Sequence, residues 1–246
     1  MRKTKEYRIP KNLLSIDNAK TVKGEKLGIK TYILYLAPHK QNDLKVNICK
    51  YASKGCIIAC LFTSGMGKFS NVIEGRVNKT NYYVQNRVGF VAQLIKEIEK
   101  TKKRHIKKGD KCAIRLNGTS DLNFSSVIKK FPSIQFYDYT PNIRRAIENK
   151  LPNYDITFSG KEDNQENVKT AMAHNIKVAI VVNFDTAALI GTTYKGKTFV
   201  NGDDTDVRFL DPKGAIVLLK AKGDAKKDTT GFVYHSFEEI KEKLFN

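Results

Sequence analysis

The chain has 246 residues, which is enough to bury a full hydrophobic core and suits one domain or at most two. Hydrophobic residues make up 41% of it, with 13 Phe and 11 Tyr, and this composition excludes a disordered polymer. Lys and Arg number 44 against 25 Asp and Glu, so the net charge of +19 attracts nucleic acid or acidic proteins.

No apolar run approaches the roughly 18 residues that a membrane span needs, and no apolar signal-peptide core follows the basic N-terminus. We therefore expect a soluble cytoplasmic protein with no membrane partner. Thiols stay reduced in the cytoplasm, so no disulfide framework is expected. We expect a single domain over residues 1–246, in which about the first 30 residues form an N-terminal extension.

Short strands and helices alternate along the chain. Runs of β-forming residues predict strands at 31–38, 111–117, 134–140, 154–160 and 177–184, and the apolar segments 207–211 and 215–223 follow. Apolar residues at helical spacing predict helices at 78–104, 124–131, 142–150, 166–175 and 236–245. The basic cluster 100–111 lies between the first of these helices and the next strand, where a solvated loop is the simplest interpretation.

The alternation from residue 31 to residue 184 is typical of βαβ units and a parallel sheet. Five or six strands at this spacing favour a parallel (β/α) barrel or partial barrel, TIM-barrel-like, over a sandwich. A doubly wound open sheet is the alternative, although the glycine-rich dinucleotide fingerprint is absent. A loop rich in cysteine, "NICKYASKGCIIACLFTSGMGKFS" (47–70), follows the first strand at its carboxyl end.

This loop holds three of the four cysteines, Cys49, Cys56 and Cys60, in the spacing C-x6-C-x3-C. Cys56 and Cys60 can lie one helical turn apart, and Gly55 allows the turn that brings Cys49 back to them. Three converging thiolates suit a soft metal. Zinc usually takes four ligands in paired short spacings, and a catalytic nucleophile needs fewer thiols. Small buried side chains are the purely structural alternative. We predict a [4Fe-4S] cluster, which would leave one iron for a different ligand.

The fourth cysteine, Cys112, stands at the start of its predicted strand, at the opposite edge of the sheet from the cysteine loop. We therefore expect it in the core. Side chains that follow the strand ends share the edge with the three cysteines. The candidates for a fourth ligand or a pocket are His39, Asn117, Thr119, Ser120, Asp121, Tyr137, Asp138 and Ser159. Helix capping is an equally good explanation for any single one of them.

A second group of ligand-type residues lies later in the chain. The segment 201–212 carries four aspartates around Arg208, namely Asp203, Asp204, Asp206 and Asp211. Bunched carboxylates can hold a hard cation, but the spacing does not fit an EF-hand loop. A turn with an Arg–Asp pair is the more economical interpretation.

Six segments together resemble the gene-product-88 family of phage proteins. They are "YASKGC…AC", "LFTSGMGKFSNV", "RLNGTSD", "FYDYT", "VRFLDPKG" and "LKAKG…KKDTTGF", between about residues 27 and 233. The resemblance implies a viral protein working in the cytoplasm of an infected bacterium, and the family supplies no mechanism.

The placement of Cys49, Cys56 and Cys60 after the first strand also resembles, more distantly, the radical S-adenosylmethionine enzymes. That resemblance implies a β/α barrel with a [4Fe-4S] cluster and S-adenosylmethionine as cofactors. The spacing departs from the usual C-x3-C-x2-C, and "NGTSD" stands where those enzymes have a glycine-rich stretch.

Three functional hypotheses follow, of which the third, a zinc-stabilised interaction protein, ranks behind the other two. The first is an iron–sulfur protein in electron transfer or redox chemistry, with an unknown redox partner; whether it is an enzyme is left open. The second is a basic protein associated with nucleic acid, in which a cluster or zinc is structural.

Overall fold

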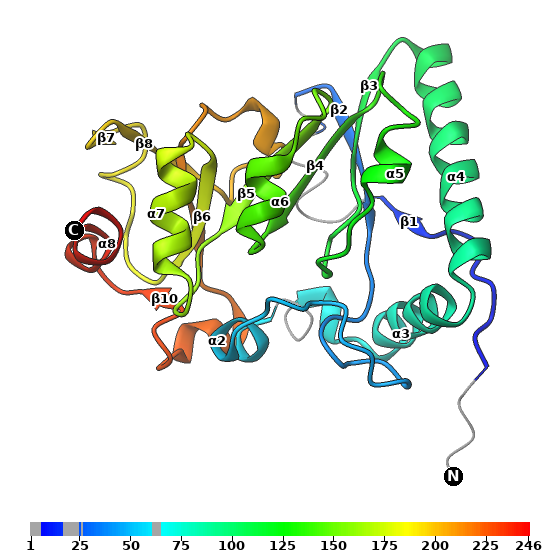
Figure 1. The fold of residues 1–246 in the computed structure, drawn as a ribbon, viewed down its shortest axis with the longest axis horizontal. Helices are drawn as coiled ribbons and strands as arrows, with labels where there is room; N and C mark the ends of the chain where they lie inside the picture. The colour runs from blue at the N-terminus through cyan, green and yellow to red at the C-terminus, as the bar shows by residue number, and fades with distance from the viewer. Residues whose placement is uncertain (1–5, 17–24, 26, 61–64) are drawn as a thin grey trace.

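A computed structural model describes residues 6–16, 25, 27–60 and 65–246 of the chain. The described part contains a ten-stranded sheet flanked by helices (Figure 1). The strands are β1 (Leu14–Ser15), β2 (Ile29–Leu34), β3 (Lys111–Arg115), β4 (Gln135–Thr140), β5 (Tyr154–Ser159), β6 (Lys177–Val182), β7 (Thr193–Tyr194), β8 (Lys197–Asn201), β9 (Ile216–Lys220) and β10 (Val233–Tyr234). The α-helices are α2 (Lys54–Ile58), α3 (Ser70–Gln85), α4 (Arg87–Lys108), α5 (Ser125–Ile128), α6 (Ile143–Glu148), α7 (Gln165–Ala173) and α8 (Phe237–Phe245).

The strand order is β1-β2-β3-β4-β5-β6-β9-β8-β7, with β10 paired to β6. All neighbours from β2 to β8 are parallel, as is the β10–β6 pair. Only the outermost pairs, β1 with β2 and β7 with β8, are antiparallel. The predicted α/β class and the largely parallel sheet are therefore confirmed.

The predicted barrel is wrong, because the described sheet does not close. Each edge ends in a two-residue antiparallel strand, β1 or β7, and these two strands do not pair with each other. At the β7 edge the chain reverses through Lys195 and Gly196, which both have positive φ. This is the geometry of a tight hairpin turn. The hairpin pairs β7 with β8, so the last strand at this edge does not pair with β1 to close a barrel.

Side chains alternate between the two faces of the sheet, as strand geometry requires. On one face Ile114, Phe136, Ile156 and Ile180 belong to the main hydrophobic core, which also includes residues of α4, α5, α7 and α8. Figure 1 shows α6 and α7 lying over this face of the sheet. The continuous apolar character of the central strands is explained by this cover.

The other face of the sheet is more polar and is packed against the segment between β8 and β9. Ala113 and Tyr137 form a small cluster there with Val207, and Phe209 packs against it. The apolar segment 207–211 forms a single 3-10 turn, η3 (Arg208–Leu210). A second such turn, η4 (Gly223–Lys227), follows β9, and η2 (Gly65–Lys68) precedes α3.

The helix predicted at 78–104 is two helices, α3 and α4, which meet at Asn86. The side chain of Asn86 accepts a hydrogen bond of 2.9 Å from the backbone N–H of Gly89 and so starts a new helix. Helix α4 then continues to Lys108 and ends at Gly109, whose φ is 70°. Most of the basic cluster 100–111 is therefore helical and not a loop. No helix in the described residues is long and apolar enough to cross a membrane.

Candidate functional site

The parallel strands bring several loops to one edge of the sheet. The segment that contains the cysteines leaves β2, residues 116–124 leave β3, and residues 160–164 leave β5. The carboxyl edge of the sheet is the place where such folds assemble binding sites. The structure confirms the expected position of Cys112, which is the second residue of β3 and lies at the opposite, amino edge.

The cysteine loop is held in place by α2 and its caps. Ser53 caps the helix by accepting a hydrogen bond of 3.2 Å from the N–H of Cys56. Glu162, in the loop after β5, accepts hydrogen bonds of 2.7 Å from the Ser53 hydroxyl and from the N–H of Gly55. A Cβ atom at Gly55 would lie 2.5 Å from the Cβ of Phe232, so only glycine fits.

The three predicted thiols influence one another electrostatically. The pKa of Cys56 is raised to about 12, chiefly by burial and to a smaller extent by the neighbouring Cys60 and Cys49. Burial likewise raises the pKa of Cys49 to about 12, with Cys60 and Asp121 acting in the same direction. Such charge effects act at short range, so the three cysteines share one partly buried region, and Cys49 and Cys56 are protonated at neutral pH.

This region does not yet have the geometry of a ligand set. In the part of the chain that the structure describes, no three His, Cys, Asp or Glu side chains are arranged so that they could hold a metal ion. Residues 61–64, which directly follow Cys60, lie outside the described part. Metal binding removes protons from thiols, and thiolate sulfur is the donor type that a soft metal prefers. The three cysteines therefore supply the right donor type, but the described side chains are not arranged as a complete ligand set.

Two of the predicted rim residues touch the cysteine loop. The Sγ of Cys49 donates a hydrogen bond of 3.6 Å to the carbonyl of Thr119, and the Thr119 hydroxyl donates to the carbonyl of Leu36. His39 also lies next to Cys49. A hydrogen bond from the backbone of His39 to Cys49 lowers the pKa of Cys49, but burial outweighs this effect and the pKa is raised. His39 has a positive φ of 49°, as expected at a tight turn.

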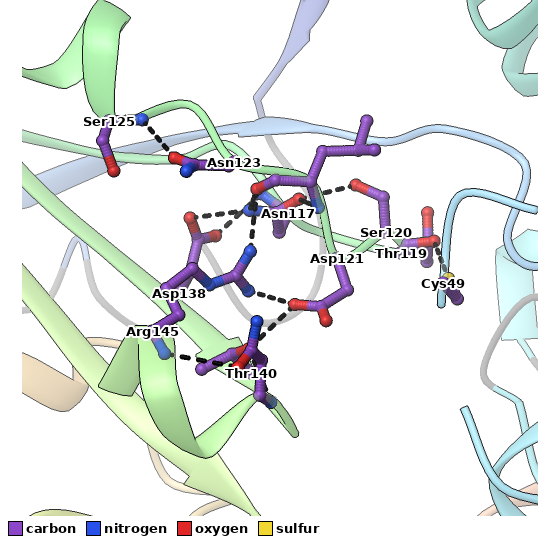
Figure 2. Close-up of polar contacts among 12 residues, drawn as sticks. Cys49, Asn117, Thr119, Ser120, Asp121, Asn123, Ser125, Asp138, Thr140 and Arg145 are labelled. Atoms are coloured by element: carbon purple, nitrogen blue, oxygen red, sulfur yellow. Dashed lines mark hydrogen bonds and ion pairs between the residues drawn. The ribbon is translucent and has the colours of Figure 1, made fainter. Parts of the chain in front are cut away.

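Asn117, Ser120 and Asp138 form a buried network in the loop whose Thr119 contacts Cys49 (Figure 2). Asp138 accepts hydrogen bonds from the backbone and side-chain amides of Asn117 and from the hydroxyl of Tyr154. The Ser120 hydroxyl donates to the Asn117 side chain. Burial raises the pKa of Asp138 to about 6. These three predicted site residues satisfy one another, so their visible role is to shape the loop after β3.

Asp121 is the carboxylate of this edge whose charge reaches Cys49. Its Oδ1 accepts a hydrogen bond of 2.9 Å from Thr140 and pairs with Arg145 (Figure 2). Its Oδ2 is buried and has no hydrogen-bond partner among the described residues. Oδ1 of Asp121 therefore stabilises the loop through Thr140 and Arg145, whereas Oδ2 makes no hydrogen bond to the described residues.

The two remaining predicted residues point elsewhere. Tyr137 lies on the polar face of the sheet, where its hydroxyl donates a hydrogen bond of 3.0 Å to Asp206. Ser159 ends β5, and its recorded contact is a backbone carbonyl that accepts from Asn164. Neither contact links these residues to the thiols.

Sequence reasoning missed the cations beside the thiols. Lys161 is 5% exposed, and its Nζ donates to the carbonyl of Tyr51 at 2.7 Å and to Asp163 at 2.8 Å. It lowers the pKa of Cys56, although burial outweighs it. Arg76 of α3 interacts with Cys60 and lies over the ring of Tyr35. Lys161 directly follows Gly160, so extending the predicted strand end by one residue would have found it.

The predicted acidic segment is resolved into separate ion pairs. Asp206 pairs with Arg115 at 3.0 Å, and Asp211 pairs with Arg208 at 3.1 Å. At the surface, Asp203 pairs with Lys222 at 2.5 Å. The interpretation as turns with Arg–Asp pairs fits these contacts, and the carboxylates do not form a cation site in the described residues.

The fold and this edge define an α/β protein with an open, mostly parallel sheet and three cysteines gathered at its carboxyl edge. The family model of gene product 88 matches residues 12–236. The chain therefore belongs to the gene product 88 family, a family of phage proteins. No curated protein and no solved structure matches the chain significantly. The resemblance to radical S-adenosylmethionine enzymes thus has no support from these comparisons.

Proposed function

We propose that the protein is a phage iron–sulfur protein that holds a [4Fe-4S] cluster through Cys49, Cys56 and Cys60 and works in electron transfer or other redox chemistry. Its place of action would be the cytoplasm of the infected host. The single observation that carries the proposal is that each of these thiols lies within electrostatic reach of another, at the carboxyl edge of the sheet. A bound cluster would supply one-electron chemistry at this edge.

The chain's own residues would contribute orientation and charge. Glu162 fixes the start of α2 through Ser53 and Gly55 and thereby orients Cys56. Lys161 places a positive charge beside Cys56, which favours the thiolate over the thiol. Metal uptake releases thiol protons, so loading should be favoured as the pH rises.

Anaerobic purification tests the proposal. A brown protein that contains iron and acid-labile sulfide, with broad absorption in the visible blue, is the expected result. A colourless protein with zinc or with no metal would refute the cluster.

Three cysteines leave one iron of the cluster without a thiolate. Asp121, His39, a small carboxylate or S-adenosylmethionine could take that place. Asp121 is the best protein candidate, because its Oδ2 has no hydrogen-bond partner in the described part and its charge reaches Cys49. The cysteine spacing differs from the C-x3-C-x2-C of radical S-adenosylmethionine enzymes, and "NGTSD" replaces their glycine-rich stretch. We therefore expect that the protein does not cleave S-adenosylmethionine. Formation of 5′-deoxyadenosine by the reduced protein would overturn this expectation.

A second candidate function, nucleic-acid binding, rests on the charge of +19 and on one face of α4. This helix exposes a row of basic side chains, Lys96, Lys100, Lys103, Arg104, Lys107 and Lys108. Binding through this row should weaken steeply with salt and should weaken further in a Lys103→Glu/Arg104→Glu variant. Undetectable binding to DNA and RNA at low salt would remove this candidate.

A further inference from the structure

Four side chains gather on the polar face of the sheet, around Tyr139 near the end of β4. Tyr139 stands two positions after Tyr137 and therefore shares its face. Thr157 of β5 pairs directly with Tyr139 in the sheet, and the guanidinium of Arg115 lies 4.6 Å from the centre of the Tyr139 ring. Burial raises the pKa of Tyr139, and Arg208 of η3 acts in the opposite direction from close by. We call Arg115, Tyr139, Thr157 and Arg208 the donor patch.

Each residue of the donor patch has a buried polar atom that makes no hydrogen bond to the described residues. These atoms are the Nε of Arg115, the hydroxyls of Tyr139 and Thr157, and the Nε of Arg208. Thr157 is fully buried and Arg208 is 1% exposed, so bulk solvent does not satisfy them. A buried donor without a partner destabilises the fold. Four such atoms in one place call for a bound group that completes their hydrogen bonds.

The four atoms have one property in common, which is that each of them can donate a hydrogen bond. A guanidinium nitrogen only donates, and a hydroxyl donates as well as accepts. A ligand rich in acceptor oxygens therefore satisfies all four atoms, whereas an amine or a cation satisfies only the two hydroxyls. Phosphate and carboxylate groups are the acceptors that guanidinium groups bind most strongly.

The charges on this face of the sheet are compatible with an anionic ligand. Three ion pairs lie here, namely Arg115 with Asp206, Arg208 with Asp211 and Lys177 with Asp155. Arg76 adds a fourth cation, because it lies over the ring of Tyr35, and Tyr35 lies beside Arg115. Four cations against three carboxylates leave one net positive charge on this face. Asp138 also acts on Arg115, but it lies on the opposite face, where its own hydrogen bonds are made.

We propose that the donor patch is a binding site for an oxyanion, the phosphate or carboxylate group of a small molecule. Arg115 is 14% exposed and Tyr139 is partly exposed, so the ligand reaches the patch from the solvent. The fully buried Thr157 forms the floor of the site. The proposal is independent of the proposed function, because no part of it requires a metal or a cluster.

The test uses the full-length protein, with inorganic phosphate and acetate as probes. The midpoint of thermal unfolding is measured as each anion replaces chloride at constant ionic strength, and its rise gives an apparent affinity. Thr157→Val and Tyr139→Phe remove the hydroxyls of the donor patch at nearly constant shape. The matched controls are Thr140→Val and Tyr154→Phe, whose hydroxyls already donate hydrogen bonds on the opposite face of the sheet.

We expect phosphate to raise the midpoint of the wild type and of both controls. Its apparent affinity should fall about fivefold or more in Thr157→Val and in Tyr139→Phe. Without phosphate the two controls should unfold at a lower temperature than the wild type, because they lose a hydrogen bond, whereas the two donor-patch variants should not. A rise with acetate as well would identify a general oxyanion site, and a rise with one anion alone would name the ligand group.

Three results would overturn the proposal. The first is a midpoint that neither anion raises. The second is an equal rise in all five proteins, which would be a general effect of the salt on stability. The third is a loss of stability without ligand in Thr157→Val and Tyr139→Phe as large as in the controls, since the protein or its water would then already satisfy these hydroxyls.

Discussion

The acidic segment 203–211 and the cysteine loop both gather metal-binding residue types in the sequence, but the fold treats them differently. Asp206 and Asp211 each have an arginine partner, Arg115 and Arg208, within about hydrogen-bonding distance. The thiols have different surroundings: burial raises the pKa of Cys56, and Cys60 and Cys49 act in the same direction. A cluster of ligands whose charges are already paired stabilises the fold, whereas thiols that are kept neutral can release their protons to a bound cation.

The largest effect should come from breaking a buried pair of the acidic segment. In Arg115→Met the carboxylate of Asp206, whose side chain is 2% exposed, would lose its cation. We expect a loss of about 3–5 kcal/mol in the free energy of unfolding, measured by urea denaturation. The exposed Lys222 offers a matched control, since Lys222→Met should cost about 1 kcal/mol or less. Similar losses in both variants would contradict the distinction between buried and exposed pairs.

Removal of the cation beside the thiols should weaken metal binding. Lys161→Met takes away the charge that lowers the pKa of Cys56 and the bond to Tyr51. We expect the affinity for Co²⁺, followed by its thiolate absorption band, to fall about 10- to 100-fold. Lys169→Met, which breaks an exposed pair with Glu166, is the control and should bind Co²⁺ like the wild type. An unchanged affinity in Lys161→Met would mean that Lys161 only supports the loop.

The smallest effect should be the pH dependence that Asp138 imposes. Its pKa is raised to about 6 in the folded protein by burial, so the folded state binds a proton more readily than the unfolded state. The contribution of this group to stability is therefore present at low pH and is lost as the pH rises through about 6. Between pH 5 and pH 7 we expect the free energy of unfolding of the wild type to fall by about 1 kcal/mol because of this group. The Asp138→Asn variant should lack this part of the pH dependence. Parallel pH profiles for the two proteins would refute the assignment.

The sequence was sufficient for the features that depend on local pattern. The alternation of strands and helices follows from burial, and strand polarity alone placed Cys112 away from the other three cysteines. The open sheet could not be predicted, because closure depends on how β1 and β7 end its edges. Arg115 and Asp206 are separated by 91 positions in the sequence, and Lys161 and Tyr51 are separated by 110. Such long-range contacts decide which ligand cluster is neutralised, and no local spacing reveals them.

The most direct test of the central claim is the iron and sulfide content of the single cysteine variants, purified without oxygen beside the wild type. The account predicts about four irons and four sulfides per chain in the wild type and in Cys112→Ala. Cys49→Ala, Cys56→Ala and Cys60→Ala should each retain almost none while remaining folded by circular dichroism. Full iron content in any of these three, or loss of iron in a folded Cys112→Ala, would contradict the account.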